Sequence, residues 1–283
     1  MTVDHETWSE RQRSASVTVD GHDADVTYYE DGTGNDGPPV VFVHGIPTWS
    51  FLWRNVVDAL AADRHVVAMD MVGYGNATMR EGIDRSIRAQ EQVLDGLLDH
   101  LEADGVSIVA HDIGGGVALR FAAHQPERVE RLVLSNAVCY DSWPVSFVNG
   151  LGVPSTLDRD EEDLASQVRS AFEEGLHGDP ADHEAFVEGM MAPWRSEGGW
   201  RSLVRDAVAT NTNHTTEIDY GAITAETTLL WGADDVLQPI DYAERLAGDV
   251  AGDATVIGLE DAYHWVVEDR PDAYAEHLRD VFV

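Results

Sequence analysis

Asp112 stands where a short apolar segment ends and three glycines begin, in the run VSIVAHDIGGG at residues 106–116. A strand followed at once by glycines and a helical pattern is typical of the strained turn called a nucleophile elbow, which lifts one side chain above a sheet. A serine at its tip would attack a carbonyl carbon. A carboxylate instead forms a useful ester by displacing a leaving group from saturated carbon, and water can then cleave that ester. The alternative is an ordinary turn in which Asp112 only caps the next helix.

Two further residues could complete a triad with Asp112, in the chain order nucleophile, acid, histidine. Asp235 follows the apolar segment TTLLW, with Asp234 as the alternative acid, and His264 follows a strand-like segment at residues 254–259. Alone, each is more typical of a loop carboxylate or of a histidine at a helix start. Together and in this order, they predict a site in which His264 activates water and Asp235 orients the histidine.

The elements that must position this triad alternate along the chain. A hairpin is expected around Asp20-Gly21, and further buried strands are expected at residues 40–43, 65–69, 106–110 and 131–134, between helical patterns. This alternation predicts an α/β fold with a largely parallel sheet covered by helices on both faces.

The strand pattern is interrupted once, from residue 137 to residue 222, by acidic helical segments rich in Trp, Phe and Met. We therefore expect a core domain formed by residues 1–136 and 223–283, with residues 137–222 inserted as a helical cap, or lid, over the catalytic edge of the sheet.

The chain resembles the α/β-hydrolases related to haloalkane dehalogenases and epoxide hydrolases, over nearly its whole length. The most specific stretch is HGIPTWSFLWRN at residues 44–55, which is similar to the His-Gly-x-Pro-Thr loop of the dehalogenases. DMVGYG at residues 70–75 resembles the next family loop, although Ala77 stands where that pattern usually has serine. The resemblance implies an α/β-hydrolase fold with a mostly parallel eight-stranded sheet. It also implies an oxyanion hole made by the backbone N–H groups of Ile46 and Ile113.

Ile46 and Ile113 also depart from the dehalogenase pattern, in which tryptophan usually follows the nucleophile and asparagine often occupies the position of Ile46. Isoleucine offers no side-chain donor to a departing halide, which would lose its hydration in an apolar pocket. Epoxide opening asks instead for a group that protonates the leaving oxygen, a task that relatives give to lid tyrosines. The sequence predicts the aspartate nucleophile and leaves both substrate classes open.

The predicted cap holds six candidates for the substrate pocket. They are Tyr140, Trp143, Phe147, Trp194, Asn211 and His214. An indole N–H of either tryptophan could bind a leaving halide, and His214 could deliver a proton near neutral pH. Tyr140 and Tyr220, at the two borders of the cap, match no family motif. For each candidate the ordinary alternative is packing within the cap or a place in a polar loop.

The composition limits the other functions that the chain could have. Its formal charge of -34 comes from 52 acidic and 18 basic residues, all of the latter arginine. Such a charge disfavours nucleic acid and anionic membranes and favours concentrated salt, where charges are screened. A hydrophobic content of 43% excludes a disordered acidic protein. With one cysteine, Cys139, and no long apolar span, we expect a soluble cytoplasmic protein of a halophilic organism.

The expected partners are a small-molecule substrate and water, without cofactor or metal. The twelve histidines are scattered and lack the paired spacing of metal ligands. GTGNDG at residues 32–37 precedes a strand instead of following one, so it does not fit a dinucleotide site. Two alternatives remain. One is a ligand-binding protein of the same fold without turnover, and the other is an ester or lactone hydrolase, in which Asp112 would have to form an anhydride.

Overall fold

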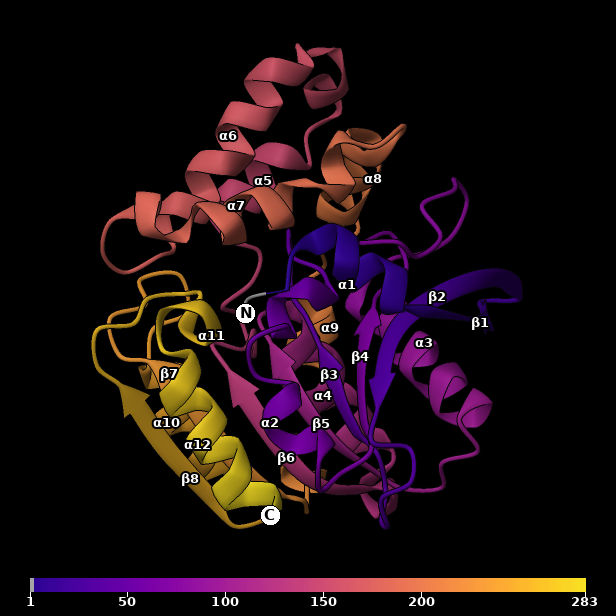
Figure 1. Cartoon of the computed structure of the whole chain (residues 1–283), viewed down its shortest axis with the longest axis vertical. Helices are drawn as coiled ribbons and strands as arrows, with labels where there is room; N and C mark the ends of the chain where they lie inside the picture. Colours follow the sequence, from indigo (N-terminus) through magenta and orange to yellow (C-terminus); the bar gives the residue numbers. More distant parts are fainter. Residues whose placement is uncertain (1–2) are drawn as a thin grey trace.

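The computed structural model describes residues 3–283, and Figure 1 shows the arrangement of its elements. One eight-stranded sheet has the order β1-β2-β4-β3-β5-β6-β7-β8. The pairs β1/β2 and β2/β4 are antiparallel and the others are parallel, which confirms the predicted mostly parallel α/β sheet. The strands are β1 (Arg13–Val19), β2 (His22–Asp31), β3 (Val40–Val43), β4 (Val66–Asp70), β5 (Val106–His111), β6 (Val129–Ser135), β7 (Glu226–Gly232) and β8 (Ala254–Leu259).

The burial of a strand follows from its place in the sheet. Central β5 buries all six of its residues, as expected of a parallel strand that is covered on both faces. Edge strand β1 alternates exposed and buried residues, so only one of its faces packs on the core. The turn of the predicted hairpin lies at Asp20 and Gly21, whose φ values of 47° and 79° are those that a two-residue hairpin turn requires.

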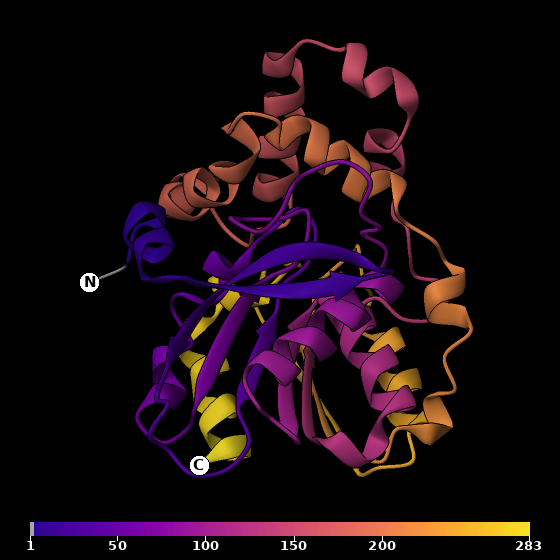
Figure 2. The same ribbon diagram turned by 90° about the vertical axis from the view of Figure 1, so that its right-hand side faces the viewer.

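Helices cover both faces of the sheet. α3 and α4 pack together on one side, and α2 and α12 pack together on the other (Figure 2). The helices are α1 (His5–Arg11), α2 (Asp58–Ala61), α3 (Ile87–His100), α4 (Ile113–His124), α5 (Ser146–Leu151), α6 (Glu161–Glu174), α7 (Glu184–Met191), α8 (Gly199–Val208), α9 (Asn213–Thr216), α10 (Asp241–Asp249), α11 (Val266–Asp269) and α12 (Pro271–Phe282). Among the described residues, none of these helices is both long and apolar enough to cross a membrane.

Helices α5 to α8, which we call the cap helices, follow β6 in the sequence and lie together above the end of the sheet where the parallel strands terminate (Figure 1). Buried indole groups join them to the core. Trp194 donates its Nε1–H to the carbonyl of Pro47 at 2.8 Å, and Trp49 donates to the carbonyl of Gly189 at 2.9 Å. The cap helices are thus held against the loop that follows β3.

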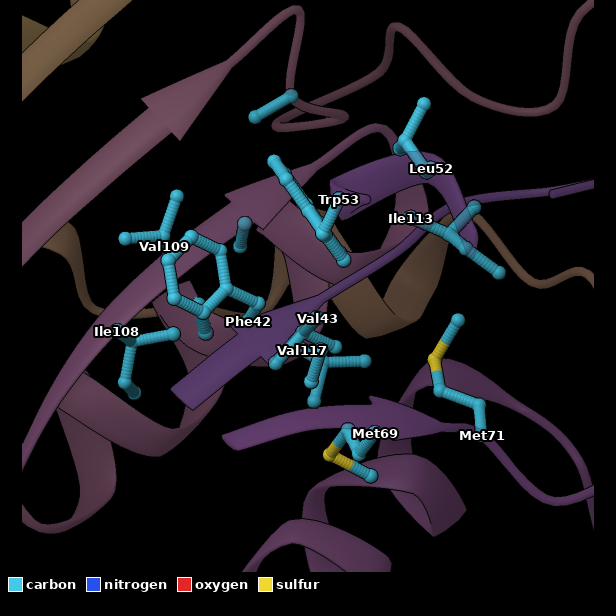
Figure 3. Close-up of a cluster of buried hydrophobic side chains, with 14 of the residues drawn as sticks. Phe42, Val43, Leu52, Trp53, Met69, Met71, Ile108, Val109, Ile113 and Val117 are labelled. Carbon is cyan, nitrogen blue, oxygen red and sulfur yellow. The ribbon is translucent and has the colours of Figure 1, made fainter. Parts of the chain in front are cut away.

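The core beneath the elbow is apolar and closely packed. Phe42 of β3 and Ile108 of β5 lie with Trp53, and Ile113 and Val117 of α4 join the same buried cluster (Figure 3). The rings of Phe42 and Trp53 are 5.3 Å apart. Full burial of a side chain of this kind stabilises the fold by about 1.5–3 kcal/mol. The turn between β5 and α4 therefore rests on a rigid base.

Candidate active site

The turn between β5 and α4 holds Asp112 in a strained conformation. Its φ of 51° and ψ of -124° lie in a region of backbone conformation that residues other than glycine rarely adopt. The Asp112 carbonyl accepts hydrogen bonds from the N–H groups of Gly115 at 2.9 Å and Val138 at 3.0 Å, which fix the turn. A Cβ on Gly114 would overlap the carbonyl of Val43. Glycine therefore lets α4 approach the strands closely enough to hold the turn.

The Asp112 carboxylate faces backbone donors. The N–H of Ile46 donates to Oδ1 at 2.8 Å, and the N–H of Ile113 lies near enough to the carboxylate to act against the rise in its pKa. A Cβ on Gly45 would overlap this carboxylate, so the loop leaves room for it only because residue 45 is glycine. The two amides expected to form an oxyanion hole thus converge on one side of Asp112.

His44 fixes the loop that presents the Ile46 amide. Its Nδ1 lies 2.8 Å from the carbonyl of Gly45, and its Nε2 lies 3.0 Å from the backbone nitrogen of Met71. Since a carbonyl only accepts and an amide N–H only donates, Nδ1 carries the hydrogen. Burial lowers the pKa of His44 to about 4, so the ring stays neutral and keeps this tautomer. This role of His44 was not predicted from the sequence, in which the His-Gly pair at residues 44–45 was the only signal for it.

His264 lies between the two predicted carboxylates. Its Nε2 is 3.8 Å from Oδ2 of Asp112, and its Nδ1 is 2.8 Å from Oδ2 of Asp235. All three side chains are buried. Asp234 is exposed, and its side chain makes no hydrogen bond to His264 within the described residues. The structure therefore brings Asp112, Asp235 and His264 together and leaves Asp234 outside.

The three charges shift one another's pKa values. Burial raises the pKa of Asp112, although His264 and the amides of Ile46 and Ile113 act in the opposite direction. Burial lowers the pKa of His264, but Asp235 and Asp112 outweigh it and hold that pKa above its usual value. Burial also raises the pKa of Asp235, and here His264 and hydrogen bonds prevail and lower it. Asp235 is thus the group most firmly held as an anion.

Asn136 holds Asp235 in place, a role that was not predicted from the sequence. Its Nδ2 donates to Asp235 Oδ2 at 2.6 Å, and its Oδ1 accepts from the N–H of Gly232 at 3.1 Å. The N–H of Leu237 donates to the other oxygen of Asp235 at 2.7 Å. The available signal was a polar residue shortly after a predicted buried strand, the same pattern that located Asp235.

Replacing Asn136 with leucine is expected to lower kcat roughly 10- to 100-fold, because a buried hydrogen bond to a charged group contributes about 1.5–3 kcal/mol. Losing this bond leaves the Asp235 anion less stabilised and so favours a protonated His264, and the acid limb of the pH–rate profile, which reports His264, should move to higher pH. Steady-state rates across pH measure both effects. Asn211→Leu, away from the triad, is the matched control, and an unmoved acid limb would count against a positioning role for Asn136.

A cavity of about 370 Å³ opens onto Asp112 and His264. Its wall is mostly apolar and joins core loops to cap helices, with Val148 from α5 and Ala171 from α6 among its residues. An apolar cavity with a few convergent polar groups is the usual form of a small-molecule site. Asp112 and His264 therefore lie on the wall of a space large enough for a small organic compound.

Two of the six predicted pocket residues, Trp143 and Phe147, line this cavity, and four do not. The hydroxyl of Tyr140 donates to Asp249 at 2.7 Å, and the Trp194 indole is already bonded to the carbonyl of Pro47.

Asn211 and His214 also lie outside the cavity wall. α9, which includes His214, packs against α4 of the core below the cap helices. The carbonyl of His214 accepts from Arg120 at 2.9 Å, and Asn211 lies within 3.4 Å of the His214 ring. No residue from 176 to 235 lines the cavity, and the segment that contains Asn211 and His214 leads back to β7.

The chain is similar in sequence to known hydrolases. Residues 38–271 match the family described as alpha/beta hydrolase fold. Haloalkane dehalogenase 2 of Mycobacterium tuberculosis is 27% identical over 268 residues, which is 91% of each chain. The 2-hydroxy-6-oxo-2,4-heptadienoate hydrolase of Pseudomonas putida is 34% identical over 237 residues, 77% of this chain and 78% of that one.

A solved structure agrees in fold. An alpha/beta hydrolase fold protein from Burkholderia ambifaria superposes with a TM-score of 0.82 at 23% identity, covering 94% of this chain and 97% of that one. Together with the family match, which spans most of the sequence, these relatives settle the class of protein. The chain belongs to the alpha/beta hydrolase fold family and is a hydrolase.

Proposed function

We propose that the protein hydrolyses a small organic substrate by attack of Asp112 on saturated carbon. The observation that carries this proposal is a carboxylate, in place of a hydroxyl, at the tip of the strained turn, with His264 Nε2 3.8 Å away. In the first step a carboxylate oxygen of Asp112 bonds to the substrate carbon as the leaving group departs with its electron pair. The product is an ester on Asp112.

His264 then drives hydrolysis of that ester. It takes a proton from water at Nε2, and the resulting hydroxide adds to the carbonyl carbon of Asp112. The developing oxyanion is stabilised by the amides of Ile46 and Ile113, which are fixed before the charge appears. Asp235, 2.8 Å from Nδ1, stabilises the imidazolium. Collapse of the intermediate expels the alkoxide, which takes the proton from His264 and leaves as the alcohol. Asp112 is left as a carboxylic acid and loses its proton to solvent, which restores the nucleophile.

Haloalkanes and epoxides are the two substrate classes that fit this step. The relative named haloalkane dehalogenase 2 supports the first. Epoxide opening by a tyrosine acid has less support, because the Tyr220 hydroxyl donates to the carbonyl of Thr215 at 2.9 Å and neither Tyr220 nor Tyr140 lines the cavity. Capture of the ester from each class by mass spectrometry, using a His264→Gln variant, tests the proposal and separates the two.

We also propose that residues 137–222 act as a cap over a core of residues 1–136 and 223–283. Support comes from the cavity, whose wall takes Phe147 and Ala171 from the inserted segment and Ile46 and His264 from the core. The formal charge of -34 supports adaptation to concentrated salt. A ligand-binding protein and an ester or lactone hydrolase stay as alternatives, which steady-state assays on haloalkanes, epoxides and esters distinguish.

The rate of ester hydrolysis should fall as the pH falls. His264 must be neutral to take a proton from water, and Asp235, which raises the pKa of His264 against the effect of burial, stays an anion when Asp112 is an ester. The ester lacks the Asp112 charge, which also raises that pKa in the free protein, so the base should be lost at a lower pH in the ester than in the free protein. Single-turnover hydrolysis of a preformed ester, followed across pH at constant salt, should show a midpoint below the His264 pKa that nuclear magnetic resonance gives for the free protein. A rate that does not change with pH would argue against His264 as the base.

A further inference from the structure

Two residues of the cavity wall, Trp143 and Gln238, each carry a buried polar atom that has no hydrogen-bond partner among residues 3–283. These atoms are Nε1 of Trp143 and Oε1 of Gln238. The two residues are 3% and 1% exposed, so neither atom is hydrated by bulk water. An unpaired buried polar group is destabilising, and a ligand that bonds to it recovers that cost. One atom is a donor and the other an acceptor.

The orientation of the Gln238 amide follows from its neighbour. Its Nε2 lies 3.3 Å from the carbonyl oxygen of Ser142, which can only accept, so the NH₂ group faces Ser142 and Oε1 is left unpaired. The Gln238 backbone carbonyl accepts from the Trp231 indole at 2.7 Å, which fixes the residue. Ser142 directly precedes Trp143 in the chain. The free acceptor and the free donor thus belong to adjoining segments of one wall.

A free donor and a free acceptor together favour binding of a hydroxyl group over binding of an anion. A halide would accept from Trp143, but the Gln238 carbonyl oxygen, with its negative partial charge, would repel it. A hydroxyl can accept from the indole N–H and donate to the carbonyl oxygen, so it satisfies both atoms. We propose that Trp143 and Gln238 bind a hydroxyl group of the substrate, which makes a hydroxylated haloalkane or epoxide the preferred substrate class. This proposal rests on the proposed function for the reacting end only.

Alcohol binding tests this recognition without turnover. Dissociation constants of α,ω-alkanediols and of 1-alkanols with the same three to six carbons would be measured by titration calorimetry in high salt. At one chain length or more, wild-type protein should bind the diol roughly 10- to 100-fold more tightly than the alkanol, since the alkanol leaves the two buried groups unpaired. The hydrophobic effect alone would favour the alkanol.

The variants assign that preference to the two residues. Gln238→Leu and Trp143→Phe should each reduce it to less than threefold, and Gln238→Met serves if the leucine variant does not fold. Gln167→Leu, the same change at a half-buried position of the wall, is the control and should keep the preference.

Two results would overturn the proposal. One is equal binding of diol and alkanol at every length. The other is bromide binding that depends on Trp143 and not on Gln238, which would identify an anion site. Asp112→Asn protein should keep the diol preference. If no substrate forms an ester on Asp112 and the preference persists, only the catalytic proposal fails.

Discussion

Asp112→Asn should lower kcat by roughly 10⁴- to 10⁶-fold, the loss that follows removal of a catalytic nucleophile. The amide has the shape of the carboxylate but cannot displace a leaving group from carbon. Its oxygen can still accept from the N–H of Ile46, which now binds Oδ1. The loss should therefore appear in the chemical step, with the fold unchanged. Steady-state assays and thermal unfolding of the same preparation measure both.

The pKa of Asp112 determines the expected stability of this variant. Burial raises that pKa, so ionising Asp112 in the folded protein is less favourable than in the unfolded chain. Its contribution to stability is then lost as the pH rises through the folded pKa. Asparagine removes this cost, so at neutral pH the variant should unfold at the wild-type temperature or above it. Asp234→Asn, an exposed change beside Asp235, is the control. Turnover retained in Asp112→Asn would exclude the nucleophile assignment.

His264→Gln should convert the enzyme from a catalyst into a protein that reacts once. Asp112 keeps its carboxylate and its amide donors, so attack on the substrate continues, but no base remains to activate water. The ester should accumulate on the peptide that contains Asp112, and peptide mass spectrometry would locate it. A haloalkane adds the mass of its alkyl group less one hydrogen, whereas an epoxide adds its whole mass.

The double variant Asp112→Asn/His264→Gln is the control for this experiment and should carry no adduct. An adduct on another residue would redirect the mechanism to that residue. Absence of adduct with every haloalkane and epoxide, together with wild-type turnover of an ester, would favour the ester or lactone hydrolase.

The sheet and the convergence of the triad could be predicted because parallel strands impose long-range order. The residues that follow β5, β7 and β8 share one edge of the sheet, so three positions far apart in sequence had to meet. Choosing Asp235 over Asp234 needed more, because only the structure shows which of two adjacent carboxylates is buried against His264.

The side-chain positions of the proposed cap were less predictable, because packed helices have no counterpart to the hydrogen-bond register of a sheet. Whether a tryptophan of residues 137–222 faces the cavity depends on contacts with distant segments. Trp194 bonds to Pro47, far from it in the sequence, whereas Trp143 keeps an unpaired N–H on the cavity wall. The composition and the helical periodicity of the sequence do not distinguish a tryptophan that bonds to the core from one that lines the cavity. The role of Asn136 could not be predicted for a related reason, since it depends on contact with Asp235, which follows the neighbouring strand β7.

The long segment between β6 and β7 also affects how the chain folds while it is being synthesised. β6 and β7 are neighbours in the sheet, yet about 90 residues separate Ser135 from Glu226. At roughly 5–20 residues per second, a ribosome needs several seconds or more to supply the missing strand. Throughout that interval the edge of β6 is open to pairing with another nascent chain. The dense negative charge of the polypeptide opposes such encounters at low ionic strength, whereas concentrated salt screens the charge and leaves the edge of β6 open to them.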